Sequence, residues 1–153
     1  MKKIKFLAMM TIAAMFATTF TSCDKDDDDD NSHKWVKEYE EFGITYSISE
    51  LKDDGSTISY SEKYQQGSDW YIYDYVYSYD KEGTITGMTE SIEFNSSSNA
   101  KLAYDEFNED EGDDDYYSSF VLNGKTITCT VSKKYLPETK DEVISEYNSL
   151  LDE

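Results

Sequence analysis

The stretch Trp70-Tyr71-Ile72-Tyr73-Asp74-Tyr75-Val76-Tyr77-Ser78-Tyr79 decides the fold, because tyrosine alternates in it with other residue types. Alternation with period two is typical of a β-strand that has two different faces. We expect the apolar side chains between the tyrosines to face the core. The opposite, exposed face would then carry a row of rings and is the candidate ligand-binding surface: Tyr71, Tyr73, Tyr75, Tyr77 and Tyr79.

Glycine turns separate this stretch from further alternating segments. Gly55, Gly83 and Gly124 each come just before a Thr-Ile pair, which predicts three β-hairpins. Counting residue pairs outward from each turn predicts one apolar and one hydroxyl-rich face per hairpin. The expected apolar faces are Ile44, Tyr46, Ile48, Ile58, Tyr60 and Tyr64; Trp70, Ile72, Val76, Met88, Ile92 and Phe94; and Phe120, Leu122, Ile127, Cys129 and Val131. The expected hydroxyl face of the first hairpin is Thr45, Ser47, Ser49, Thr57, Ser59 and Ser61.

Two helices are predicted to cover the apolar side. Ser96 to Asn99 can cap a helix whose apolar stripe is Ala100, Ala103, Tyr104 and Phe107. Pro137 and a capping box of Thr139 with Glu142 start a second helix, with the stripe Val143, Ile144, Tyr147, Leu150 and Leu151. The predicted fold is an α+β domain with an antiparallel sheet of about six strands, in the order ββββαββα, and a small β-barrel is the alternative.

The count in the second hairpin places Asp74 opposite Glu90 on the apolar side. Two carboxyl groups about 5 Å apart are what a retaining glycosidase uses, so an enzyme of this kind is a third hypothesis. A bulge at Gly87 would instead shift the count and separate the pair. No nucleophile motif supports catalysis, and we expect a protein that is not an enzyme. Cys129 is expected to be a buried, inert thiol.

The N-terminus has the three parts of a secretory signal: a cationic start, an apolar run from Phe6 to Ala17, and small residues that lead to Cys23. The residues before Cys23 resemble the lipobox of bacterial lipoproteins, with Phe20 as a departure. The aspartates that follow are similar to the surface-export signals of Bacteroidetes-type outer-membrane lipoproteins. This resemblance implies a lipid-anchored, surface-exposed protein of the outer membrane, acylated (palmitate) at Cys23. Asp24 favours the alternative of a lipoprotein that faces the periplasm.

We therefore expect a signal peptide over residues 1–22, an acidic tether over 23–33 and a single domain over 34–153. Without the signal peptide and its three lysines, the chain has 11 lysines against 33 acidic residues, a formal charge of −22, and it contains no arginine. Such a charge makes nucleic acid an implausible partner. No cofactor or metal motif is present, although the acidic loop Asn108 to Asp115 could hold Ca²⁺ weakly.

The leading hypothesis is a non-catalytic binding module that meets a glycan or a protein through the face rich in Tyr, Thr and Ser. Phenol rings provide stacking area and hydroxyl groups at low entropic cost. The alternative is an acidic inhibitor or immunity-type protein that docks on a cationic enzyme, because the charge of −22 attracts basic partners.

Overall fold

The computed structural model describes residues 33–109 and 115–152. The predicted signal peptide, Cys23 and most of the acidic tether lie outside these residues, as do residues 110–114 of the acidic loop. The compact unit that the structure defines comprises His33–Glu153. No helix in the described part of the chain is long and apolar enough to cross a membrane.

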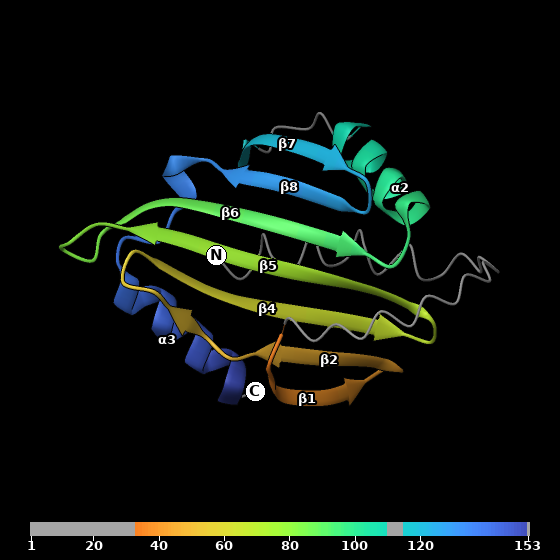
Figure 1. The fold of residues 1–153 in the computed structure, drawn as a ribbon, viewed down its shortest axis with the longest axis horizontal. Coiled ribbons are helices and arrows are strands. Elements are labelled where there is room, and N and C mark those ends of the chain that lie inside the picture. Colours follow the sequence, from red (N-terminus) through yellow and green to blue (C-terminus); the bar gives the residue numbers. More distant parts are fainter. Residues whose placement is uncertain (1–32, 110–114, 153) are drawn as a thin grey trace. The chain divides into compact units, whose positions relative to one another are not determined.

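An antiparallel sheet of eight strands forms the body of the unit, with the order β1-β2-β4-β5-β6-β8-β7 and β3 paired to β4 (Figure 1). The elements are β1 (Trp35–Glu41), β2 (Ile44–Ser49), β3 (Lys52–Asp53), β4 (Thr57–Gln66), β5 (Asp69–Tyr79), β6 (Ile85–Phe94), α2 (Ser97–Glu109), β7 (Tyr117–Asn123), β8 (Thr126–Val131), the 3-10 turn η1 (Lys133–Tyr135) and α3 (Lys140–Asp152). The α+β class is confirmed. The sheet is open, because β1 and β7 are separate edges, so the barrel alternative is wrong.

The prediction of about six strands missed β1 and β3. Four of the seven residues of β1 are charged, and this hides its alternation. Its turn to β2 consists of Phe42 and Gly43, both with positive φ (53° and 77°). A bulky residue rarely adopts this left-handed conformation, so Phe42 is an unexpected turn residue, whereas Gly43 is a common one. β3 is only two residues long.

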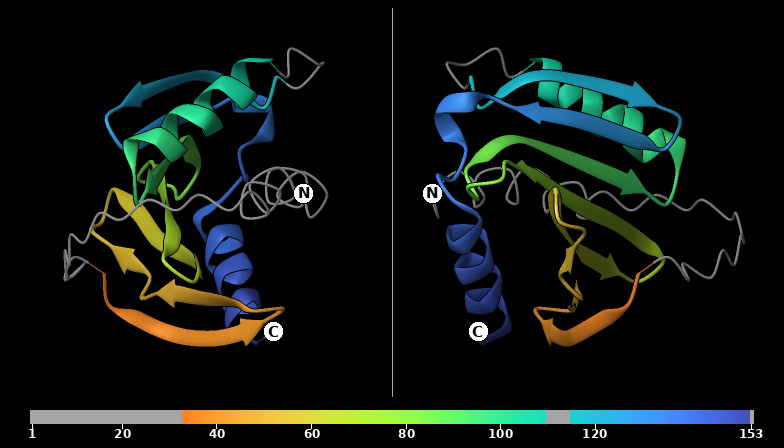
Figure 2. Two further views of the ribbon diagram at one scale, coloured as in Figure 1. Left: turned by 90° about the vertical axis from the view of Figure 1, so that its right-hand side faces the viewer. Right: turned by 60° about the vertical axis from the view of Figure 1, so that its left-hand side comes forward.

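Both helices lie on one side of the sheet, which we call the inner face (Figure 2). Helix α2 reaches this face through Tyr104 and Phe107, whose rings lie 5.6 and 6.3 Å from that of Phe120 on β7. Helix α3 reaches it through Tyr147, whose ring lies 5.3 Å from that of Tyr60 on β4. The predicted one-sided sheet with two covering helices is therefore confirmed.

The predicted capping residues act as expected. Ser96 Oγ accepts a hydrogen bond from the Asn99 N–H of α2 (3.1 Å), and Thr139 Oγ1 accepts one from Glu142 N–H of α3 (3.3 Å). At the other end of α3, Lys37 Nζ donates to the carbonyl oxygens of Leu150 and Leu151. A cation at a helix C-terminus satisfies the last carbonyl groups and complements the helix dipole.

Candidate binding surface

The tyrosine row of β5 points into the molecule, so its prediction as an exposed platform is wrong. The side chains of four of its five members are buried: Tyr71, Tyr73, Tyr75 and Tyr77, with exposed fractions between 2% and 6%. Tyr79, at the end of the strand, is half-buried. Val76, expected in the core, is 37% exposed.

A β-bulge explains the error. Tyr79 pairs with Ile85 as the turn predicts, but Ser78 pairs with Gly87, so that Thr86 is an extra residue in β6. Beyond this bulge every residue of β6 is shifted by one relative to the count. The apolar side chains of β6 therefore share a face with the tyrosines, in the pairs Tyr77↔Met88, Tyr73↔Ile92 and Tyr71↔Phe94.

The same shift separates the two carboxyl groups on which the glycosidase hypothesis depended. Asp74 pairs with Ser91, and Glu90 pairs with Tyr75 on the opposite face. Asp74 Oδ1 instead accepts a hydrogen bond from Ser61 Oγ (2.6 Å) and lies 3.0 Å from His33 Nε2. The predicted pair is therefore wrong.

The other two hairpins have the predicted faces. Tyr46 pairs with Tyr64, and Ile48 with Glu62, on the inner face. In the third hairpin Phe120 pairs with Cys129 and Leu122 with Ile127. The loop is Gly124-Lys125 rather than Asn123-Gly124, a difference that leaves the faces unchanged. Cys129 is free and 1% exposed, and its burial raises the pKa of its thiol to about 12, as expected of an inert cysteine.

The inner face combines these rings with two buried carboxyl groups. Glu62 and Glu90 are 7% and 4% exposed. Tyr64 O–H donates to Glu62 Oε2 (2.5 Å), and the hydroxyls of Tyr116 and Tyr117 donate to the two oxygens of Glu90 (3.0 and 2.5 Å). These bonds offset part of the desolvation cost of the carboxyl groups.

Burial raises the pKa of the buried tyrosines of β4 and β5 above that of an ordinary phenol: Tyr60, Tyr64, Tyr71, Tyr73, Tyr75 and Tyr77. For Tyr64 and Tyr117 the largest cause is desolvation, and the neighbouring Glu62 and Glu90 raise the pKa further. The pKa values of Tyr73 and Tyr75 rise for the same first reason. These phenols are therefore neutral at all physiological pH values, and Tyr64 and Tyr117 donate hydrogen bonds inside the fold.

Aromatic contacts cross the inner face from strand to strand. Tyr39, Tyr46, Tyr64, Tyr71 and Phe94 come from five adjacent strands, and each ring lies 4.9 to 6.2 Å from the next. Cross-strand aromatic pairs contribute roughly 0.2 to 1 kcal/mol each. Most of these five rings are buried, so their contacts mainly stabilise the sheet.

The outer face has a different composition. The side chains that point outward from β4, β5, β6 and β8 follow from the pairings across these strands. Hydroxyl residues dominate: Thr57, Ser59, Ser61, Ser78, Thr89, Ser91, Thr126, Thr128 and Thr130. We call these nine residues the hydroxyl face. Lys63, Asp74 and Glu93 are the charged side chains among the outward positions of these four strands.

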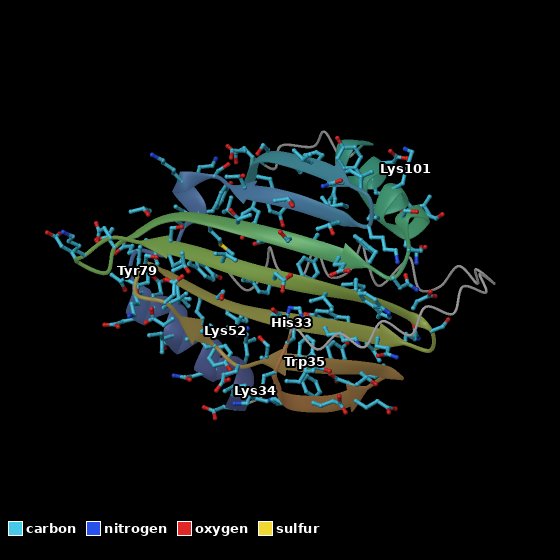
Figure 3. The ribbon with its side chains drawn as sticks, in the orientation of Figure 1. His33, Lys34, Trp35, Lys52, Tyr79 and Lys101 are labelled. Carbon is cyan, nitrogen blue, oxygen red and sulfur yellow. The ribbon has the colours of Figure 1, made fainter. Side chains whose placement is uncertain are left out.

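The charges on the outer face lie mainly toward one end. Lys63 and Glu93 flank Ile72 across β5, and Lys63 Nζ lies 5.6 Å from the centroid of the Trp70 ring. Asp74 is engaged with Ser61 and with His33, whose ring stacks on that of Trp35 at 5.2 Å. His33 and Trp35 are labelled over the sheet in Figure 3. The rest of the hydroxyl face, around Val76, carries no charge.

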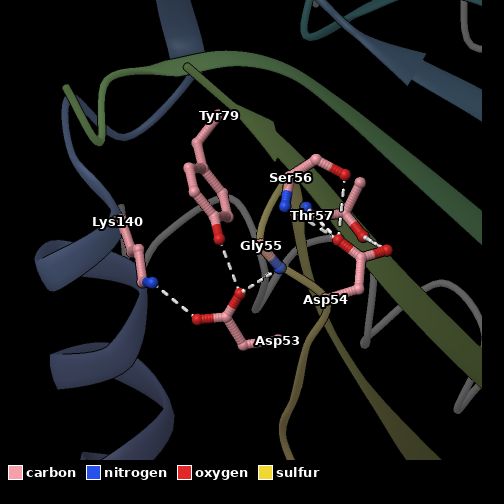
Figure 4. A network of polar contacts seen from close by, with 7 residues as sticks. All are labelled: Asp53, Asp54, Gly55, Ser56, Thr57, Tyr79 and Lys140. Carbon is pink, nitrogen blue, oxygen red and sulfur yellow. Dashed lines mark hydrogen bonds and ion pairs between the residues drawn. The ribbon is translucent and has the colours of Figure 1, made fainter. Parts of the chain in front are cut away.

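A separate polar cluster joins α3 to the sheet at the end of β5 (Figure 4). Asp53 Oδ2 lies 2.5 Å from Lys140 Nζ, and Asp53 Oδ1 accepts hydrogen bonds from Tyr79 O–H (2.6 Å) and Gly55 N–H (3.0 Å). These bonds lower the pKa of Asp53 to about 2, with Lys140 as the largest cause. Tyr79 thus has a structural partner rather than a free ring for stacking.

The described residues contain no cluster of His, Cys, Asp and Glu that could hold a metal ion. In the acidic loop, Asp115 is described, and its carboxylate binds Lys134 Nζ and Tyr135 O–H. Comparison of the chain with models of protein families, with curated proteins and with solved structures gave no match.

Proposed function

We propose that the mature chain is a lipid-anchored, non-catalytic domain of the outer cell envelope that binds a protein partner through its hydroxyl face. Cys23 would carry the lipid, and the acidic run after it would hold the domain away from the membrane surface. The observation that carries the proposal is the charge distribution. Charged residues make up 31% of the chain, yet the row Ser59, Val76, Thr89 and Thr130 of this face has none, and Asp74 in the next row is engaged with Ser61 and His33.

This composition supports a protein partner. The centres of protein interfaces are depleted of charged residues and have a polar rim, because burial of an unpaired charge is costly. The hydroxyl face has this arrangement: the exposed residues Val76, Ser78 and Thr130 lie in a neutral part, and Lys63 and Glu93 lie at the opposite end. With the tyrosine row inside, the stacking area expected for a glycan is reduced to the half-buried Trp70 and Trp35.

Photo-cross-linking in whole cells tests the proposal on the full chain. A benzophenone amino acid replaces Thr128, which is exposed on the outer face, and in a matched control it replaces Ser145, which is exposed on α3. We expect a discrete cross-linked species of higher mass from position 128 and none from position 145. Equal products from both positions, or a product from position 145 alone, would remove the hydroxyl face from the account.

A charge in the centre of the face provides the second test. With the cross-linker at position 128, Thr130→Lys should lower the yield roughly tenfold, because a charge buried without a partner costs more than about 1 kcal/mol. Thr130→Val, which keeps the shape and removes only the hydroxyl, should have a much smaller effect. If the valine variant instead abolishes binding of a neutral glycan on an array, the face binds sugars and the protein proposal fails.

The alternative function, an acidic inhibitor of a cationic enzyme, draws on the formal charge of −22. Salt separates the two functions. Attraction between the whole acidic domain and a basic partner is screened as ionic strength rises from about 0.01 to 0.15 M, whereas contacts across a neutral face are almost unaffected. A cross-link at position 128 that disappears over this range favours the inhibitor.

A further inference from the structure

The two edges of the sheet differ in a way that points to an assembly. Edge strand β1, Trp35–Glu41, carries Lys37, Glu38, Glu40 and Glu41. Edge strand β7, Tyr117–Asn123, has the sequence YSSFVLN and carries no charge. Charged side chains on an edge strand keep other strands from pairing with it. β1 is protected in this way, and β7 is not.

The backbone of β7 has hydrogen-bonding groups that face away from the sheet. Asn123 pairs with Thr126 across a two-residue loop, so these two residues exchange both of their backbone hydrogen bonds. The backbone groups of Asn123 and Val121 therefore face β8. Those of the residues between and before them, Leu122 and Phe120, face away from the sheet, so their N–H and C=O lie on the free edge. The bond from Phe94 N–H to Lys125 C=O agrees with this phase, because it shows that Lys125 faces β6 and therefore that Thr126 faces β7.

The side chains leave the edge accessible. Phe120 packs against Tyr104 and Phe107 of α2 on the inner face, which anchors the strand. On the outer face Val121 is 61% exposed and Ser119 is exposed. In Figure 1, β7 forms the upper border of the sheet.

We propose that β7 is a dimerisation edge, on which a second copy of this chain adds its own β7 in the antiparallel direction. Copies of a strongly acidic chain repel each other, so self-association requires a contact from which charge is absent, and β7 provides one. A two-fold axis at Phe120 pairs Ser119 with Val121 of the second copy, within the regular part of β7, and lets the outward backbone groups of the two Phe120 residues bond to each other.

A β-bulge limits this register. β7 is irregular between Tyr117 and Ser119, so regular pairing with the second copy is confined to the residues from Ser119 onward. Ser119, Phe120 and Val121 lie in this part, and none of them is charged. The interface is self-complementary, as a two-fold dimer requires.

Cysteine cross-linking in whole cells tests the dimer and its register together. At this register Ser119 lies opposite Val121 of the second copy as a non-hydrogen-bonded pair, with Cα atoms about 4.5 Å apart, within the range of a disulfide. Two differently tagged full-length chains, one with Ser119→Cys and one with Val121→Cys, are expressed together and oxidised. We expect a disulfide-linked species of twice the chain mass that carries both tags.

The controls decide between this dimer and the other outcomes. Cells that express either variant alone should give at least fivefold less product, because residues 119 and 119 of the two copies are offset diagonally. The unmodified chain gives the background from Cys23 and Cys129, and Val36→Cys on β1 gives the product of random collisions on a crowded surface. Absence of the mixed product, equal product from the single variants, or a cross-link to a protein of another mass would overturn the proposal.

Discussion

The two faces of β5 differ from what their composition suggests. The face with Trp70, Ile72 and Val76 looks like the core side of the strand, and the tyrosine face looks like its surface. The structure buries the tyrosines and leaves Val76 37% exposed, whereas Ile72, on the same face as Val76, is 1% exposed as its composition suggests. The difference shows that alternation defines two faces without telling which face is covered. That choice depends on the neighbouring strands, which match tyrosine with Ile58 of β4 and with Met88 and Ile92 of β6.

Burial of tyrosine is favourable here for two physical reasons. Each ring removes more area from water than a valine or isoleucine does, about 150 to 250 Å². The hydroxyl groups also have acceptors: Glu62 and Glu90 accept bonds from Tyr64, Tyr116 and Tyr117, and Tyr147 O–H donates to the carbonyl oxygen of Ser49 (2.8 Å). The buried side-chain nitrogen and oxygen atoms of the described residues all have hydrogen-bond partners.

Alkaline titration should show the largest difference between the inner layer and an ordinary surface. The folded pKa of the inner phenols lies above the usual value of 10, as for Tyr60, Tyr64, Tyr73 and Tyr75. The stability that depends on their protonation is therefore complete below pH 10 and is lost above it, at about 1.4 kcal/mol per pH unit for each phenol. We expect cooperative unfolding above pH 10.

The measurement is tyrosinate absorbance followed together with circular dichroism. Ionisation of the buried fraction should coincide with the loss of β-sheet signal. If most of the 14 tyrosines instead ionise near pH 10 while the sheet remains folded, the inner layer is open to water and the assignment of the faces is wrong.

Substitution of neighbouring residues on β5 should show the next largest difference. Tyr77 is 2% exposed, and Tyr77→Ala should lower the free energy of unfolding by about 3 to 5 kcal/mol, as removal of a buried ring does. Val76→Ala, one position away on the outer face, should change it by no more than about 0.5 kcal/mol. Denaturant unfolding measures both values. Tyr77→Phe separates the loss of the hydroxyl from the loss of the ring, and a larger effect at Val76 would restore the face assignment expected from composition.

Most of the fold follows from local signals in the sequence. Alternation and the glycine turns located six of the strands, and the capping residues Ser96 and Thr139 located both helices. The face of a strand, by contrast, depends on every residue between it and the turn. One extra residue, Thr86, reversed the inner face of β5 relative to β6 while the other two hairpins kept their predicted faces.

Of the candidate surface, only the outward hydroxyl residues of β4 could be predicted from the sequence. Ser59 and Ser61 were assigned to the outer side of β4, whereas the outward positions of β5 and β6 depend on the bulge. Gly87, which pairs with Ser78 at the bulge, was the available signal in the sequence, because glycine within a strand is typical of a bulge. The contact of His33 with Asp74 joins residues 41 positions apart and had no local signal.

A substitution in the polar cluster around Tyr79 should give the smallest of the three effects on stability, because hydrogen bonds rather than burial hold this ring. Its hydroxyl and Lys140 Nζ both bind Asp53, whose pKa they lower from 3.8 to about 2. A lowered carboxyl pKa contributes stability that is present above the ordinary pKa and is lost as the pH falls through the folded value. Asp53→Asn should therefore reduce stability at neutral pH by less than Tyr77→Ala does, and the difference in stability from the unmodified chain should vanish between pH 4 and pH 2.

Because the cluster is partly exposed, salt should also diminish this difference in stability. Glu106→Gln on the exposed side of α2 is the control, and a difference that grows on acidification would show that Asp53 does not bind Lys140 as a carboxylate.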